Sequence, residues 1–206
     1  MPMKTDEREY RNLDSIEARK EEEGQVVEGY ACTFNQPYTL YRTSEYTVME
    51  QVDPAAFDGA DMDDVIMQYD HAGRVFARKR NGTLELSCDE HGLKIRADLG
   101  GTEIGRQLYE EIRGGYTDKM SFGFTVAEDV TKETEEDDGK RTILRTITKV
   151  RKLYDVSAVS LPANDATEIS ARSLSEGVIA KAMEERHAIE ERQRKIEAIR
   201  AIRIGG

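Results

Sequence analysis

The sequence has little of what several protein classes require. Its two cysteines, Cys32 and Cys88, are too few and too far apart for a disulfide scaffold or a zinc site, so we expect two reduced thiols. No apolar run approaches the ~20 residues of a bilayer-spanning helix. The first residues also lack the apolar stretch of a signal peptide. These absences favour a cytosolic protein that does not contact a membrane.

The chain also lacks an excess of positive charge. It has 30 basic and 41 acidic side chains, a formal net charge of −11. Such a surface gains nothing from the counterion release that drives binding to phosphate backbones, so we expect no nucleic-acid partner. Charged residues make up 34% of the 206 residues and apolar ones 38%. This balance predicts one domain with a lean core and an appendage outside it.

Metal and cofactor motifs are missing as well. The three histidines form no pair with zinc-site spacing, and Asp61, Asp63 and Asp64 lack the glycine and the distal glutamate of a calcium loop. The pairs Gly100-Gly101 and Gly114-Gly115 match neither a dinucleotide fingerprint nor a P-loop. We therefore expect neither a metal nor a cofactor.

Short strands dominate what is present. Apolar alternation and turn residues predict strands at 25–34, 45–52, 65–69, 74–78, 83–88, 93–99, 119–126, 141–150 and 152–161. Ile104, Leu108 and Ile112 recur at helical spacing and predict a helix over 102–113. This pattern predicts an α+β domain built as a mostly antiparallel β-barrel, spanning residues 25–172. The polar residues 1–24 are expected to pair with its first strand.

The last part of the chain differs in kind. Residues 173–176, Ser-Leu-Ser-Glu, match a capping box, and the residues to about 202 form a charged helical pattern with only a thin apolar stripe. We expect residues 173–206 to be a helical arm outside the core.

Three residues are candidates for nucleophilic catalysis. His71 directly follows a predicted buried strand, and Ser121 stands between bulky neighbours in another. Asp155 is a carboxylate in an otherwise apolar strand, which is costly unless a hydrogen donor or a positive charge meets it. A serine, a base and an orienting group form a hydrolytic triad whatever their chain order. The alternative for Ser121 is a buried hydroxyl bonded to the backbone.

Four separated motifs resemble one known family. They are Glu50–Phe57 (EQVDPAAF), Gln68–His71 (QYDH), Lys119–Phe124 (KMSFGF) and Asp155–Ala163 (DVSAVSLPA). In this order they resemble the motifs of the tailed-phage prohead proteases, the capsid-maturation serine proteases related to the herpesvirus assemblins. The resemblance extends from about Val26 to about Ser170 and implies a mostly antiparallel barrel wrapped by a few helices.

The resemblance also implies residue roles. His71 matches the general base and Ser121 the nucleophile. Asp155 stands where the herpesvirus relatives carry a second histidine, which makes the expected triad Ser-His-Asp; Asp70 is a rival for the third place. The oxyanion-hole donors are expected near Ala163-Asn164.

The function implied is a serine endopeptidase that works inside the immature capsid in the host cytoplasm. Its substrates and partners would be the major capsid protein with its scaffolding segment, and the protease itself, with the portal protein and further copies of the chain as additional partners. We expect a self-cleavage between Ala163 and Met183 that releases the arm. The alternative is a non-catalytic scaffolding or assembly protein.

Overall fold

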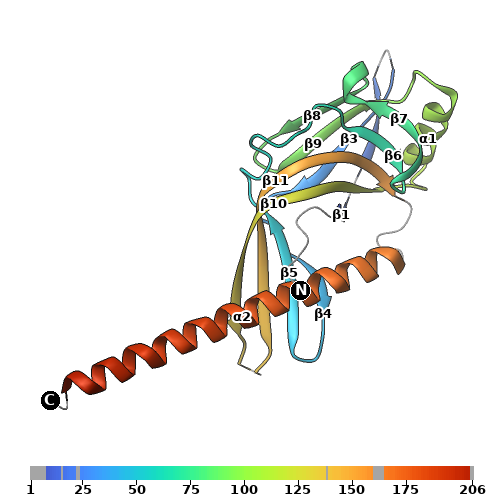
Figure 1. Ribbon diagram of the computed structural model, residues 1–206. Coiled ribbons are helices and arrows are strands. Elements are labelled where there is room, and N and C mark those ends of the chain that lie inside the picture. Colours follow the sequence, from blue (N-terminus) through green and yellow to red (C-terminus); the bar gives the residue numbers. More distant parts are fainter. Residues whose placement is uncertain (1–7, 15, 22–23, 138, 160–164, 205–206) are drawn as a thin grey trace.

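The computed structural model describes residues 8–14, 16–21, 24–137, 139–159 and 165–204. These ranges contain two β-sheets and two α-helices (Figure 1). The seven-stranded sheet contains β1 (Glu9–Asp14), β4 (Tyr38–Arg42), β5 (Tyr46–Val52), β6 (Ile66–Tyr69), β7 (Ala72–Arg78), β10 (Lys119–Glu135) and β11 (Arg141–Val159). The four-stranded sheet contains β2 (Ile16–Glu21), β3 (Gly24–Thr33), β8 (Leu84–Cys88) and β9 (Gly92–Asp98). The helices are α1 (Glu103–Arg113) and α2 (Asp165–Ile204), and a 3-10 turn covers Lys79–Asn81.

The long antiparallel hairpin of β10 and β11 is the centre of the larger sheet. On the outer edge of β11, β5 pairs in parallel with residues 141–147 and β6 with residues 155–158. The sequence predicts two strands, 141–150 and 152–161, where the structure has the single strand β11. A strand of 19 residues is long enough to carry two partners in succession.

The expected closed barrel is not what the described residues form. The strands make two open sheets. One has the order β1-β10-β11-β5-β4, with β6 paired to β11 and β7 paired to β6, and the other has the order β2-β3-β9-β8. Strand count and alternation predict a β-rich fold, but they do not show which edges meet. The fold is mixed, mostly strands, with a long C-terminal helix.

The main core lies between the sheets. Met120, Phe122 and Phe124 of β10 are fully buried in it, together with apolar residues of β3 and β9. The rings of Phe122 and Phe124 stack with centroids 4.5 Å apart. The helix α1 adds Leu108 and Ile112 to this core, and its N-terminus is capped by the Thr102 side chain.

The polar N-terminal segment divides between the sheets. β2 pairs antiparallel with β3. β1 leaves this sheet and pairs with β10, with Tyr10 opposite Gly123 and Asn12 opposite Ser121. The pattern of a short polar strand gives no sign of a partner more than a hundred residues away.

The C-terminal helix is not wholly outside the core. α2 begins at Asp165, so Ser173 lies inside the helix and does not cap it. Val178 and Ala182 are buried against Val48 of β5 and Ile143 of β11, in a small apolar cluster separate from the main core. Leu174 and Ile179 of the helix pack beside them, partly buried. The sequence obscures this contact because these few apolar residues are set among charges. Beyond this contact the helix extends past the sheet (Figure 1). Within the described ranges, no helix is long and apolar enough to cross a membrane.

Candidate active site

One face of the β10–β11 pair carries polar side chains. Because Met120, Phe122 and Phe124 point into the core, the alternating residues Ser121 and Gly123 point to the opposite face. In the antiparallel register Ser121 faces Ser157 and Gly123 faces Asp155 on β11. Paired residues share a face, so the ladder itself places Asp155 beside Ser121.

His71 reaches this face through a tight turn. Asp70 and His71 connect β6 to β7, and both have positive φ, 47° and 57°. Two central residues with positive φ between paired strands are the pattern of a type I′ hairpin, which matches strand twist. Asp and His are among the non-glycine residues that tolerate this conformation best. The Asp70 N–H donates to the Ala158 carbonyl at 3.0 Å, which fixes the turn to the end of β11.

The structure brings His71, Ser121 and Asp155 into direct contact. The His71 Nε2 lies 2.5 Å from Ser121 Oγ, and Nδ1 bonds Asp155 Oδ1. With the proton of the neutral ring on Nδ1, that nitrogen donates to the carboxylate and Nε2 accepts the serine hydroxyl proton. Ser157 Oγ donates to the same Asp155 oxygen at 3.0 Å. The site is enclosed, since Ser121 is 0% and Asp155 1% exposed.

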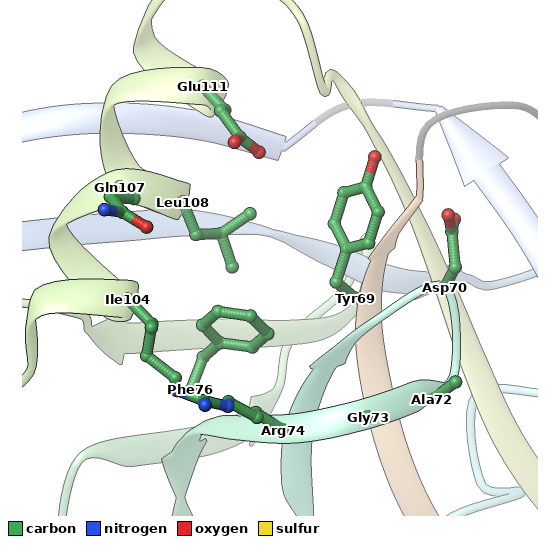
Figure 2. A pocket seen from close by; sticks show the side chains of 10 residues that line it. All are labelled: Tyr69, Asp70, Ala72, Gly73, Arg74, Phe76, Ile104, Gln107, Leu108 and Glu111. Atoms are coloured by element: carbon green, nitrogen blue, oxygen red, sulfur yellow. The ribbon is translucent and has the colours of Figure 1, made fainter.

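Asp155 bonds His71 Nδ1, whereas Asp70, the rival for the third position, is a lining residue of a neighbouring cleft. Its side chain lies beside Tyr69 at the rim of a cleft between the β6–β7 hairpin and α1 (Figure 2). The cleft measures about 530 Å³. Phe76, Ile104 and Leu108 give it an apolar wall, and it adjoins the turn that carries His71.

Tyr10 of β1 and Arg8, directly before that strand, complete the surroundings, and sequence reasoning misses both. The Tyr10 ring packs on His71 with centroids 4.3 Å apart. The Arg8 guanidinium lies 3.7 Å from Asp155 Oδ2 and 3.8 Å above the Tyr154 ring. The sequence could not place Tyr10 and Arg8 here, because it carries no local signal that β1 pairs with β10.

The neighbours of Tyr10 in the chain point to the other side of the sheet, into a buried ion-pair network. Its members are Glu9 and Arg11 of β1, Glu50 of β5, Asp129 of β10, Arg145 of β11 and Lys181 of α2. Its three acids balance its three bases. The Arg145 guanidinium bonds Glu50 at 2.6 Å, Glu9 at 2.8 Å and Asp129 at 2.7 Å. The network thus joins β1 and α2 to the central strands.

Glu50 is the most enclosed member of this network, with no exposed surface. Burial alone would raise the pKa of its carboxyl, but the charges of Arg11 and then Arg145, with hydrogen bonds from Arg11 and Tyr38, outweigh burial and lower it to about 2. Glu50 and the arginines around it are therefore all charged at neutral pH.

Among the described residues, no group of three or more His, Cys, Asp and Glu side chains could hold a metal ion. The expected oxyanion donors near Ala163-Asn164 fall outside the described residues.

Comparisons with known proteins identify the family. No curated protein matches the chain. The capsid assembly protease gp21 of bacteriophage T4 is a structural neighbour with a TM-score of 0.39 and 12% sequence identity, over 76% of this chain and 100% of that one. The model of the caudovirus prohead serine protease family matches residues 14–181, most of the chain. The expected family is thereby confirmed: the chain belongs to the caudovirus prohead serine proteases.

Proposed function

We propose that this capsid-maturation protease is a serine endopeptidase in which Ser121 is the nucleophile and His71 the general base. The observation that carries the proposal is the imidazole bonded at both nitrogens, to the Ser121 hydroxyl and to the Asp155 carboxylate. As Ser121 Oγ bonds the peptide carbonyl carbon, its proton passes to His71 Nε2. The same proton then goes to the amine that leaves when the C–N bond breaks. Water hydrolyses the resulting ester by the same route.

Asp155 has two roles in this scheme. It holds the His71 proton on Nδ1, so that Nε2 is free to accept, and its charge balances the imidazolium that forms during the step. General base assistance of this kind contributes about 10²- to 10⁴-fold to a rate.

We propose that the substrates are the scaffolding segment of the major capsid protein and the protease itself, inside the prohead. The family supports a capsid substrate. The cleft beside His71, with its apolar wall, provides a place for an apolar side chain of the bound segment (Figure 2).

The test is labelling of Ser121 with a fluorophosphonate, followed by mass spectrometry of the labelled peptide. The wild-type protein should be labelled and should cleave its co-expressed capsid protein, whereas Ser121→Ala and His71→Ala should do neither. Thr125→Ala is the matched control, because Thr125, like Ser121, is a buried hydroxyl residue of β10 and is not a member of the triad. An unlabelled wild type inside assembled particles would favour the alternative, a scaffolding protein.

Self-cleavage is tested in the same preparations. We propose a cut between Ala163 and Met183 in active protein that is absent from Ser121→Ala. Because residues from 165 onward are helical, that stretch must unwind before cleavage. An intact mass in active protein, with the capsid protein fully processed, would rule out self-trimming and leave the protease assignment standing.

A further inference from the structure

Gly123 of β10 lies directly under the Asp155 carboxylate. A Cβ built on Gly123 would stand 2.3 Å from Asp155 Oδ2 and 2.8 Å from Cε1 of Tyr10. Both distances are shorter than real Cβ contacts. Gly123 is not among the glycines with positive φ, so its backbone would accept any residue. The glycine is needed for space and not for conformation.

Asp155 has no freedom to give way. Its Oδ1 is held by His71 Nδ1 and by Ser157 Oγ at 3.0 Å, and its main chain pairs with β10 on one side and β6 on the other. A carboxylate displaced from Gly123 therefore loses its contact with His71.

Tyr10 closes the site from the β1 side. Its ring packs on His71 with the planes at 57° to one another, opposite Gly123 in the β1–β10 register. Glu9 and Arg11 on either side of it are fixed in the ion-pair network on the other face of the sheet. The strand is thus anchored at the two residues that flank Tyr10, which holds the ring in place.

On the basis of the proposed function, we propose that Gly123 and Tyr10 are positioning residues of the triad. Gly123 leaves the space in which Asp155 meets His71 Nδ1, and Tyr10 limits the imidazole to the orientation that faces Ser121. Neither residue reacts with substrate. Loss of either should therefore lower kcat and leave KM nearly unchanged.

The first test replaces Gly123 by alanine, with Gly101→Ala as the matched control. Gly101 has open space within 4 Å of its Cβ position and no positive φ. Gly123→Ala should lower kcat about 10²- to 10⁴-fold, the range expected for loss of the orienting carboxylate, while Gly101→Ala stays within about twofold of wild type. Equal kcat for the two variants would overturn the proposal.

A double-mutant cycle separates positioning from general damage. If Gly123→Ala acts mainly by displacing Asp155, adding it to Asp155→Ala should lower kcat far less than adding it to the wild type, and the remainder is due to the Cβ contact with Tyr10 at 2.8 Å. Effects that multiply would overturn the proposal. If Gly123→Ala alone fails to fold, Asp155→Ala in the same chain should restore the melting temperature, since the obstructing carboxylate is gone; failure to restore it would also count against the proposal.

Tyr10 is tested by the pair Tyr10→Ala and Tyr10→Phe. Phenylalanine keeps the ring over His71 and should keep kcat within about threefold, whereas alanine should lower it about 10- to 100-fold at unchanged KM. Equal losses in the two variants would assign the effect to the hydroxyl and refute the role of the ring.

Fluorophosphonate labelling distinguishes failure of the proposed function from failure of this inference. No label on Ser121 of the wild type refutes the proposed function. Equal labelling of the wild type and Gly123→Ala refutes only this inference.

Discussion

The Asp155 carboxylate is buried in a strand and is stabilised there by hydrogen-bond donors and a positive charge. It is 1% exposed, and burial of a carboxylate without partners would be costly. Its Oδ1 bonds His71 Nδ1 and Ser157 Oγ, and its Oδ2 lies 3.7 Å from the Arg8 guanidinium. An amide in its place keeps the shape but can present an NH₂ to the imidazole, which favours the wrong tautomer.

We therefore expect Asp155→Asn to lower kcat about 10²- to 10⁴-fold while the melting temperature changes little. Steady-state hydrolysis of a peptide substrate measures kcat, and circular dichroism measures the melting temperature. Asp70→Asn is the control and should keep kcat within about threefold, because Asp70 lies at the cleft rim. A larger loss with Asp70→Asn than with Asp155→Asn would assign the third position to Asp70.

The sequence indicated the residues of this site where a polar residue stands within or directly after an apolar strand. His71, Ser121 and Asp155 stand out because each is polar at or within a buried strand. Tyr10 and Gly123 do not, because a tyrosine in a polar segment and a glycine in a strand are common. Their importance depends on the pairing of β1 with β10, which has no local signal.

Ion pairs of Glu9 and Arg11 hold β1 to the central strands. The Arg11 guanidinium bonds Glu50, which the same network holds charged with a pKa of about 2 against an ordinary value of 4.5. A carboxyl whose folded-state pKa is lowered stabilises the fold above its unfolded pKa. That stability is lost as the pH falls from about 4.5 toward 2.

Glu50→Gln should accordingly destabilise the protein at neutral pH by about 3–5 kcal/mol, since it leaves Arg11 and Arg145 poorly paired. As the pH falls below 4.5, the free energy of unfolding of the variant should also decrease less steeply than that of the wild type. Urea unfolding at several pH values measures both effects. Glu128→Gln is the matched control, because Glu128 is an exposed partner of Lys149 and should cost less than about 1 kcal/mol. Parallel pH profiles for Glu50→Gln and the wild type would contradict the assignment of this charge.

α2 is attached to the sheet by a short apolar contact. Val178 is 0% exposed against Val48 and Ile143, whereas Ile189, three turns further on, is 58% exposed. Val178→Ala should cost about 1–3 kcal/mol, and Ile189→Ala should stay within about 0.5 kcal/mol of wild type. Thermal unfolding of both variants measures the difference. Equal costs would mean that the helix is not docked as described.

Local pattern predicted most of the strands and the α1 helix, because alternation and capping are local. Other features depend on partners distant in the chain. The long β11 pairs with β5 and β6 at its two ends, and α2 begins at Asp165, before the capping box. Two open sheets instead of a closed barrel follow from the same long-range pairings.

The described residues combine an enclosed site with a helix in which a docked segment, from Leu174 to Arg186, is followed by an exposed one. Lys181 pairs with Asp129 and Arg186 with Glu133, both on β10. The described side chains from His187 to Glu197 are exposed. The docked part therefore belongs to the folded body, and the exposed part is available to another molecule of the assembling shell.

Two truncations separate these parts. A chain ending at Arg186 keeps the buried contacts of Val178 and Ala182 and both ion pairs to β10, so it should keep its melting temperature and its Ser121 labelling. A chain ending at Ser173 uncovers Val48 and Ile143 and removes Lys181 from the ion-pair network, so it should melt at a clearly lower temperature. The chain ending at Arg186 should also cleave a peptide substrate at the wild-type rate. When it is co-expressed with the capsid protein, however, purified proheads should contain less of it than of the wild-type protease.

Because that chain keeps its fold and its labelling, a lower content in proheads would assign recruitment to the exposed segment of α2. Packaging at the wild-type level would instead place the recruiting surface on the sheets.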